Sequence, residues 1–104
     1  MLSKKEKMTN KIITNATLKI NPEFIEEVLP LAIETKAHIL LEEGCENFVL
    51  TRKTEELNTI VIFAIYTSKE TYDWHLKQDY VKRFFAFLNG KLITPPELTY
   101  LEEI

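Results

Sequence analysis

The segment LEEGCENF, residues 41–48, is the most informative stretch of this 104-residue chain. A glycine that follows a long segment of helical periodicity is typical of a left-handed C-cap, so we expect a helix to end at Gly44. Residues 46–52 then have the pattern of a strand. Further along, residues 68–76 (SKETYDWHL) begin a second helix, and Thr67 with Glu70 fits a capping box.

Upstream of this segment, hydrophobic and polar residues alternate over residues 11–20, which predicts a first strand. Asn21-Pro22-Glu23 then has the composition of a helix start, with proline at the first helical position. The helix that follows carries an apolar stripe as far as Gly44. Pro30 lies inside it and is expected to kink or reset it.

Downstream, residues 59–66 (TIVIFAIY) predict a third strand that is apolar on both faces. The next helix presents Tyr72, His75 and Leu76 on one face, by their i, i+3, i+4 spacing. We expect a break near residues 78–79 and a second helical stretch that ends at Asn89-Gly90. A loop at Pro95-Pro96 then precedes a last strand carrying Leu98, Tyr100 and Ile104.

The predicted order of elements is β-α-β-β-α-β. This order is typical of the α+β class with a ferredoxin-like fold, in which a four-stranded antiparallel sheet carries both helices on one face. We assign residues 11–104 to a single domain of this kind. Residues 1–10 are predicted to be a flexible N-terminal segment because they are polar and lack periodicity.

The third strand has consequences for assembly. Its two faces are apolar, whereas the helices of a ferredoxin-like fold cover only one face of the sheet. A second copy of the chain can cover the other face. The sequence therefore predicts a homodimer that packs sheet against sheet.

Composition and charge exclude several kinds of partner. The net charge of −3 does not favour a nucleic-acid partner or an anionic membrane surface, and no segment is apolar enough for a membrane span. Cys45 has no second cysteine to pair with, which favours a reducing cytoplasm. His38 and Glu42 are spaced i, i+4 but lack a third ligand, so we interpret them as a solvated helix face and expect no metal site.

Four short motifs follow one another along the chain: Ala16-Thr17-Leu18-Lys19-Ile20; Glu42-Glu43-Gly44-Cys45 with Phe48; Tyr66-Thr67-Ser68; and His75 with Tyr80. Taken in this order, they resemble the motifs of the antibiotic biosynthesis monooxygenase family, which are quinol-monooxygenase-like proteins with a dimeric α/β barrel. The chain departs from the family pattern at two positions. Ala64 stands where an acidic residue is frequent, and Asp79 stands where a second histidine is frequent.

The resemblance implies a cofactor-independent monooxygenase that oxidises a small aromatic or quinol-type substrate with dioxygen and needs no metal or flavin. It implies that His75 is the base, because a neutral imidazole titrates near working pH. It implies that Asn15 donates a hydrogen bond to the substrate oxyanion. The substrate-binding walls would be aromatic, from Trp74, Phe48, Phe63, Tyr66 and Tyr72.

Other interpretations remain open from the sequence. His75 can equally be a satisfied core residue, and Asn15 can serve a structural hydrogen bond. The loss of the polar residues at Ala64 and Asp79 favours a non-catalytic small-molecule-binding or structural dimer. An isomerase would use His75 to shuttle protons. A haem-degrading relative would use Asn15, but the position expected to bind iron falls near Phe85, which has no ligand atom.

Overall fold

The computed structural model describes residues 10–104, so the predicted flexible segment lies, but for its last residue, outside the described part of the chain. The strands and helices follow in the order β1 (Ile12–Lys19), η1 (Pro22–Phe24), α2 (Ile25–Ile39), β2 (Cys45–Lys53), β3 (Glu56–Tyr66), α3 (Lys69–Leu76), α4 (Asp79–Leu88) and β4 (Glu97–Leu101). The predicted break in the second helical region separates α3 from α4. Within residues 10–104, no helix combines the length and the hydrophobicity needed to cross a bilayer.

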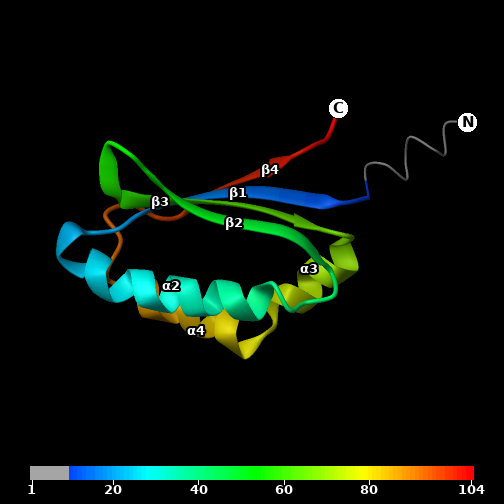
Figure 1. Cartoon of the computed structure of the whole chain (residues 1–104), viewed down its shortest axis with the longest axis horizontal. Coiled ribbons are helices and arrows are strands. Elements are labelled where there is room, and N and C mark those ends of the chain that lie inside the picture. Colours follow the sequence, from blue (N-terminus) through cyan, green and yellow to red (C-terminus); the bar gives the residue numbers. More distant parts are fainter. Residues whose placement is uncertain (1–9) are drawn as a thin grey trace, which may run out of the picture.

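The four strands form one antiparallel sheet in the order β2-β3-β1-β4. The helices lie together on one side of this sheet, and the other side carries no helix (Figure 1). This arrangement confirms the predicted α+β, ferredoxin-like fold. The sheet is open, with β2 and β4 as its edges, and does not close into a barrel within the chain.

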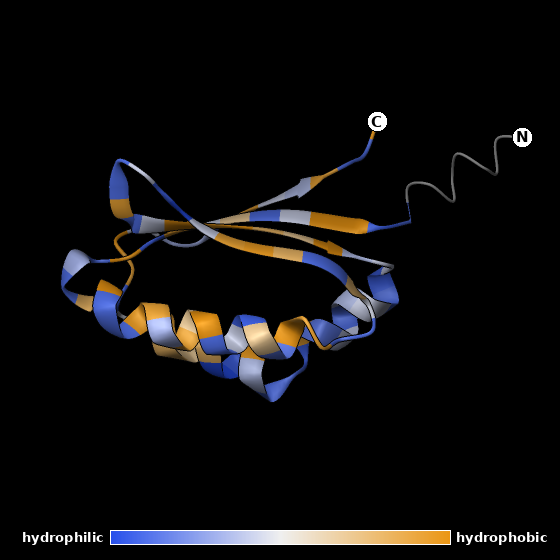
Figure 2. Cartoon of the chain, viewed as in Figure 1, coloured by the Kyte–Doolittle hydropathy of each residue, from blue (hydrophilic) through white to orange (hydrophobic). Residues whose placement is uncertain are grey.

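The strand register decides which side chains face the helices. Thr14 of β1 lies opposite Ala64 of β3, and Asn15 lies opposite Phe63. Because successive side chains of a strand point to opposite faces, Thr14 and Ala64 share the helix face while Asn15 and Phe63 share the uncovered face. Hydrophobic residues are found throughout the strands as well as in the helices (Figure 2).

The core fills the space between the helix layer and the sheet. From the sheet, Leu18, Ile20 and Ile60 are almost fully buried. From the helices, they meet one cluster of buried residues: Val28, Ala32, Phe84 and Leu88. Burying each large side chain contributes roughly 1.5–3 kcal/mol, so this cluster provides much of the stability that holds α2 and α4 on the sheet.

Three local expectations need correction. The only glycine with positive φ in residues 10–104 is Gly90, at 82°, so Gly44 is not a left-handed cap. Glycine is required there because a Cβ would collide with the side chain of Thr71. The capping box lies one residue later than predicted, between Ser68 and Thr71. Of the two alternatives for Pro30, a kink or a new helix start, the new start is wrong, because α2 continues through Pro30 as one helix.

Candidate functional site

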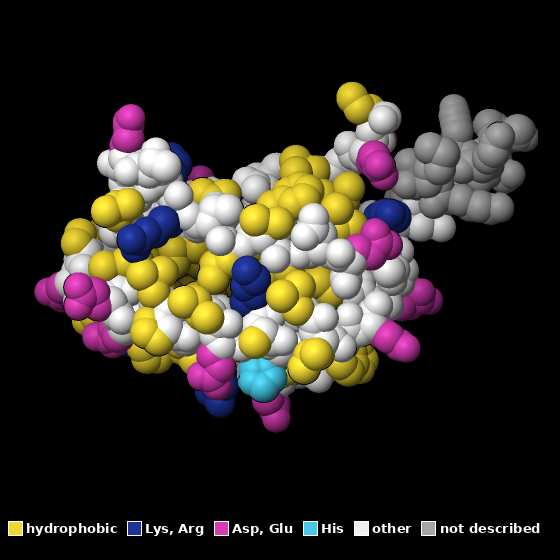
Figure 3. Space-filling view, viewed as in Figure 1, with side chains coloured by type: hydrophobic (Ala, Val, Ile, Leu, Met, Phe, Trp, Pro, Cys, Tyr) yellow, Lys and Arg dark blue, Asp and Glu magenta, His cyan; other side chains and the backbone are white. Residues whose placement is uncertain are grey.

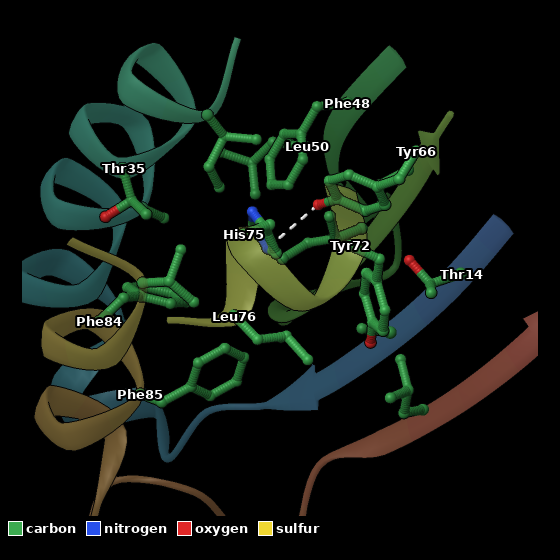
Figure 4. Close-up of a pocket in the computed structure, with 17 residues that line it drawn as sticks. Thr14, Thr35, Phe48, Leu50, Tyr66, Tyr72, His75, Leu76, Phe84 and Phe85 are labelled. Carbon is green, nitrogen blue, oxygen red and sulfur yellow. Dashed lines mark hydrogen bonds between the residues drawn. The ribbon is translucent and has the colours of Figure 1, made fainter. Parts of the chain in front are cut away.

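A cavity of about 130 Å³ lies between the sheet and the helices. Helix-facing residues of all four strands line it together with inward residues of α2, α3 and α4, and Figure 4 shows these side chains converging on it. Its lining is mostly hydrophobic. The polar side chains that reach it are Thr14, Thr35, Tyr66, Tyr72 and His75.

His75 is the centre of the polar end of this cavity. It is the seventh residue of α3, whose start is fixed by the capping box of Ser68 and Thr71, and it is only 6% exposed. Its Nε2 lies 3.1 Å from the hydroxyl of Tyr66, the last residue of β3 (Figure 4). The two rings also pack against each other, with centroids 4.6 Å apart.

Glu42 holds the other side of the imidazole. It follows α2 in the turn before β2 and is 7% exposed. The Nδ1 of His75 lies 3.1 and 3.0 Å from its two carboxylate oxygens. Tyr80 at the start of α4 donates its hydroxyl to the same carboxylate at 2.6 Å. Four side chains from four separate segments therefore form one continuous hydrogen-bonded chain, Tyr66–His75–Glu42–Tyr80.

The chemistry of these groups sets the direction of each hydrogen bond. A carboxylate only accepts, so the Nδ1 of a neutral His75 carries the proton and donates it to Glu42. The Nε2 is then left as an acceptor for the hydroxyl of Tyr66. The arrangement of hydroxyl, imidazole and carboxylate is one that lets an imidazole take a proton at Nε2 while the carboxylate stabilises the resulting cation.

Tyr66 is suited to remain protonated in this chain. Burial raises the pKa of its phenol far above the usual tyrosine value, and the neighbouring negative groups, among them Glu42, raise it further. Burial also raises the pKa of Tyr72, helped by its 3.1 Å hydrogen bond to Tyr100 of β4. Both phenols therefore enter any chemistry as neutral groups that can donate and accept hydrogen bonds.

The structure brings together only part of the predicted site. His75, Tyr66, Tyr72 and Phe48 all line the cavity. Asn15 and Phe63 instead face the uncovered side of the sheet, so Asn15 is not near the imidazole of His75. Trp74 is 53% exposed and does not line the cavity, because it follows the outer face of α3.

Sequence reasoning missed three polar residues. Glu42 was interpreted as part of a solvated helix face with His38, but it is buried, whereas the exposed His38 stacks on the ring of Tyr80. Nothing local in the sequence marks Glu42 as the residue that turns inward rather than Glu43. Tyr80 belongs to the motif that begins at His75, but the sequence does not indicate which residue its hydroxyl would bind. Thr14 had a usable signal, since it is a polar residue on the apolar face of its strand.

The lining contains no Lys, Arg, Asp or Glu side chain. Apart from Glu42, which is buried behind His75, the charged groups in this view lie on the outside of the molecule, where Figure 3 shows acidic side chains mainly around the rim and hydrophobic ones across the middle. A molecule in the cavity would thus meet apolar walls and a few neutral hydrogen-bonding groups, of which the Tyr66–His75 pair is the one equipped to move a proton.

Comparisons with known proteins agree with this architecture. A family model described as "Antibiotic biosynthesis monooxygenase" matches residues 11–86. A conserved protein from Methanosarcina mazei has the same fold, with a TM-score of 0.85 at 20% identity over 96% of this chain and 99% of that one. A provisional antibiotic biosynthesis monooxygenase from Caulobacter crescentus also gives a TM-score of 0.85, at 24% identity over 100% of this chain and 99% of that one.

A Bacteroides thetaiotaomicron protein of unknown function, described as a possible oxidoreductase, gives a TM-score of 0.82 at 19% identity, over 91% of this chain and 99% of that one. At these identities the solved structures show a shared fold. No curated protein matches the sequence.

Proposed function

We infer a function from one premise, that this chain belongs to the antibiotic biosynthesis monooxygenase family. On that premise, it is a monooxygenase that oxidises a small quinol-type aromatic with dioxygen and uses no metal or flavin. The observation that carries this proposal is the buried Tyr66–His75–Glu42 chain, which ends at an apolar cavity. His75 is the base, Glu42 is a positioning residue, and Tyr66 replaces Asn15 as the group beside the reacting oxygen.

The first step is loss of a proton from a substrate hydroxyl. Tyr66 donates to Nε2 of His75 and can accept a hydrogen bond from the substrate with its free lone pair, so the proton passes through Tyr66 to the imidazole. Glu42 holds the imidazole in the required tautomer and stabilises its cation. Tyr66 keeps the proton that it takes from the substrate, and it then donates a hydrogen bond to the substrate oxyanion.

The substrate anion supplies the electrons for the oxygen chemistry. An electron-rich quinolate passes an electron to dioxygen, and recombination forms a carbon–oxygen bond. One oxygen atom stays on the ring, while the other leaves as water with the two hydrogens that the ring loses. A quinol and dioxygen thus give a hydroxyquinone and water, with atoms and electrons balanced. The apolar lining protects the reactive intermediate from bulk water.

Oxygen uptake by the purified protein with a panel of quinols tests this proposal. With the wild type, we expect oxygen uptake faster than spontaneous oxidation of the quinol. In His75→Gln, the enzymatic rate should fall by roughly 10²–10⁴-fold, which is the usual contribution of a general base. His38→Gln is the matched control, because His38 is the chain's other histidine and is exposed. It should retain its activity.

An absence of enzymatic uptake with every quinol, or full activity in His75→Gln, would contradict the proposal. If the panel also bound tightly in the cavity without turnover, a non-catalytic small-molecule-binding protein would be the better interpretation. The haem-degrading alternative loses its support, because Asn15, which it would use, faces away from the cavity.

Two further parts of the proposal concern assembly and location. The uncovered sheet face carries hydrophobic side chains at its centre, including Val61, Phe63 and Ile65 of β3, which supports a homodimer through this face. The single cysteine, Cys45, supports a cytoplasmic location, where thiols stay reduced.

A further inference from the structure

We infer that the cavity takes a single-ring, uncharged dihydroxybenzene, with one hydroxyl at the Tyr66–His75 pair and the second oxygen at Thr14. This inference rests on the proposed function, since it names the substrate class of the same site. Three independent features carry it: the volume of the cavity, the absence of charge in its lining, and one hydroxyl that has no partner.

The volume limits the number of rings. A dry cavity of roughly 150 Å³ in another protein holds one benzene molecule. The cavity beside His75 has about 130 Å³, so it accommodates one aromatic ring but not two fused rings. Its walls include Phe48, Phe84 and Phe85, from β2 and α4. Because the side chains around the cavity are closely packed, they would have to rearrange to make room for a second ring.

The lining also limits the substituents. No Lys, Arg, Asp or Glu side chain reaches the cavity, so a carboxylate, sulfate or ammonium group on the ring would be buried without a counter-charge. Burying an unpaired charge is strongly unfavourable. A ring that bears only hydroxyl groups avoids this cost.

Thr14 supplies the site for a second oxygen. Among the polar residues of the lining, Thr35 donates its hydroxyl to the carbonyl of Leu31 at 2.7 Å, the Tyr72 hydroxyl is paired with Tyr100, and the Tyr66 and His75 groups are paired with each other. Figure 4 shows the Thr35 oxygen turned toward its own helix. Each of these groups therefore already has one hydrogen-bond partner within the protein.

The hydroxyl of Thr14 has no hydrogen-bond partner among residues 10–104, although the residue is only 6% exposed. Among these residues, every buried side-chain nitrogen or oxygen without solvent-accessible surface has a hydrogen-bond partner. The unpartnered Thr14 oxygen therefore retains some accessible surface. Thr14 lines the cavity (Figure 4). Buried hydroxyls are normally satisfied. A ligand oxygen would complete this one, on the same sheet face as Tyr66.

The test measures binding without oxygen, by titration calorimetry of the full chain under nitrogen. The ligands are hydroquinone, phenol, 1,4-dihydroxynaphthalene and 4-hydroxybenzoate. We expect hydroquinone to bind more tightly than phenol by about 2- to 10-fold, which is the value of one hydrogen bond. The two-ring diol and the charged acid should each bind at least about 10-fold more weakly than hydroquinone.

Three matched variants isolate the hydroxyl of Thr14. Thr14→Val should weaken the binding of hydroquinone by about 2- to 10-fold and leave the binding of phenol unchanged, so that the two ligands bind with equal affinity. Thr35→Val alters the same lining, but its hydroxyl is engaged in α2, so it should preserve the preference for hydroquinone. Thr14→Ser retains a hydroxyl and should also preserve it, which separates loss of the hydrogen bond from altered packing.

Equal binding of hydroquinone and phenol by the wild type, tighter binding of the two-ring diol, or an unchanged preference in Thr14→Val would overturn the inference. Its failure is distinguishable from failure of the proposed function. Selective anaerobic binding without oxygen uptake in air would refute the oxygenase and leave the ligand class intact. Oxygen uptake that favours the two-ring diol would do the reverse.

Discussion

Glu42 and Glu43 are adjacent and chemically identical, yet only Glu42 is buried against an imidazole. Replacing Glu42 with Gln keeps its size and a hydrogen-bond acceptor but removes the charge that stabilises protonated His75. We expect Glu42→Gln to lower kcat by on the order of 10²-fold or more, as for the carboxylate of a catalytic triad, with a smaller change in KM. Steady-state oxygen uptake measures both constants.

Glu43→Gln is the control for this prediction, because the side chain is exposed and one position away. It should behave as the wild type. A change in KM alone in Glu42→Gln would indicate that the carboxylate supports the cavity wall rather than the base.

Tyr66 also gives the stability a predictable dependence on pH. Its pKa is raised in the folded state, chiefly by burial, so the folded protein holds a proton that the unfolded chain loses near the usual tyrosine pKa of about 10. The stabilisation is fully present below pH 10 and declines as the pH rises above it. The raised pKa values of Tyr72 and Tyr80 act in the same direction.

The variant Tyr66→Phe isolates this contribution. At pH 8 it should be less stable than the wild type by about 1 kcal/mol or more, because His75 loses a buried hydrogen bond. Above pH 10 the difference should shrink, since Phe has no proton to lose. Urea unfolding at pH 8 to 11 measures both curves, and a constant difference across this range would contradict the assignment.

At the scale of elements, the periodicity of hydrophobic residues was sufficient to predict the four strands, the helices and the break between α3 and α4. Strand register was harder, because a shift of one residue exchanges the two faces of the sheet. The alternation of β1 separates Asn15 from Thr14 correctly, but the sequence does not say which face lines a cavity. The candidate site consequently included Asn15 and omitted Thr14.

The two glycines also show that the sequence does not reveal the surroundings of a residue in the fold, and they allow a paired prediction. Both follow helices, but Gly90 has a positive φ and free space around it, whereas Gly44 is in close contact with Thr71. Gly90→Ala should cost about 1–2 kcal/mol for the left-handed backbone. Gly44→Ala should cost about 1–3 kcal/mol for overpacking.

Thermal and urea unfolding of the two variants measure these costs, and a third variant separates their causes. Thr71→Gly removes all three colliding atoms, so it should offset part of the loss in the Gly44→Ala background, measured relative to its effect on the wild type. The same change should recover nothing in the Gly90→Ala background, because no side chain lies near that position. Equal responses in the two backgrounds would contradict the assigned role of Gly44.

At the scale of the whole molecule, the site depends on contacts that no local pattern contains. Glu42 and His75 are 33 residues apart and meet only after α2 and α3 have packed on the sheet, and Tyr80 reaches Glu42 across 38 residues. The sequence could therefore single out His75 as a candidate base without identifying the groups that hold it. Those groups follow from tertiary packing rather than from spacing along the chain.

The uncovered sheet face gives the last prediction. Phe63 lies on this face in the centre of β3, between Asn15 of β1 and Val49 of β2. If a second copy covers it, Phe63→Lys buries a charge without a partner, which is strongly unfavourable. Light scattering after size exclusion should then show the wild type at twice the 12.2 kDa protomer mass and Phe63→Lys at the protomer mass.

Ile33→Lys is the matched control, because Ile33 is an exposed hydrophobic residue of α2 on the helix layer, away from the sheet face. It should leave the mass unchanged, since the proposed interface does not include the helices. A wild type that remains at the protomer mass at high micromolar concentration would exclude sheet-to-sheet pairing. Dissociation by Ile33→Lys but not by Phe63→Lys would move the interface to the helices, and the apolar face of β3 would then need a different explanation.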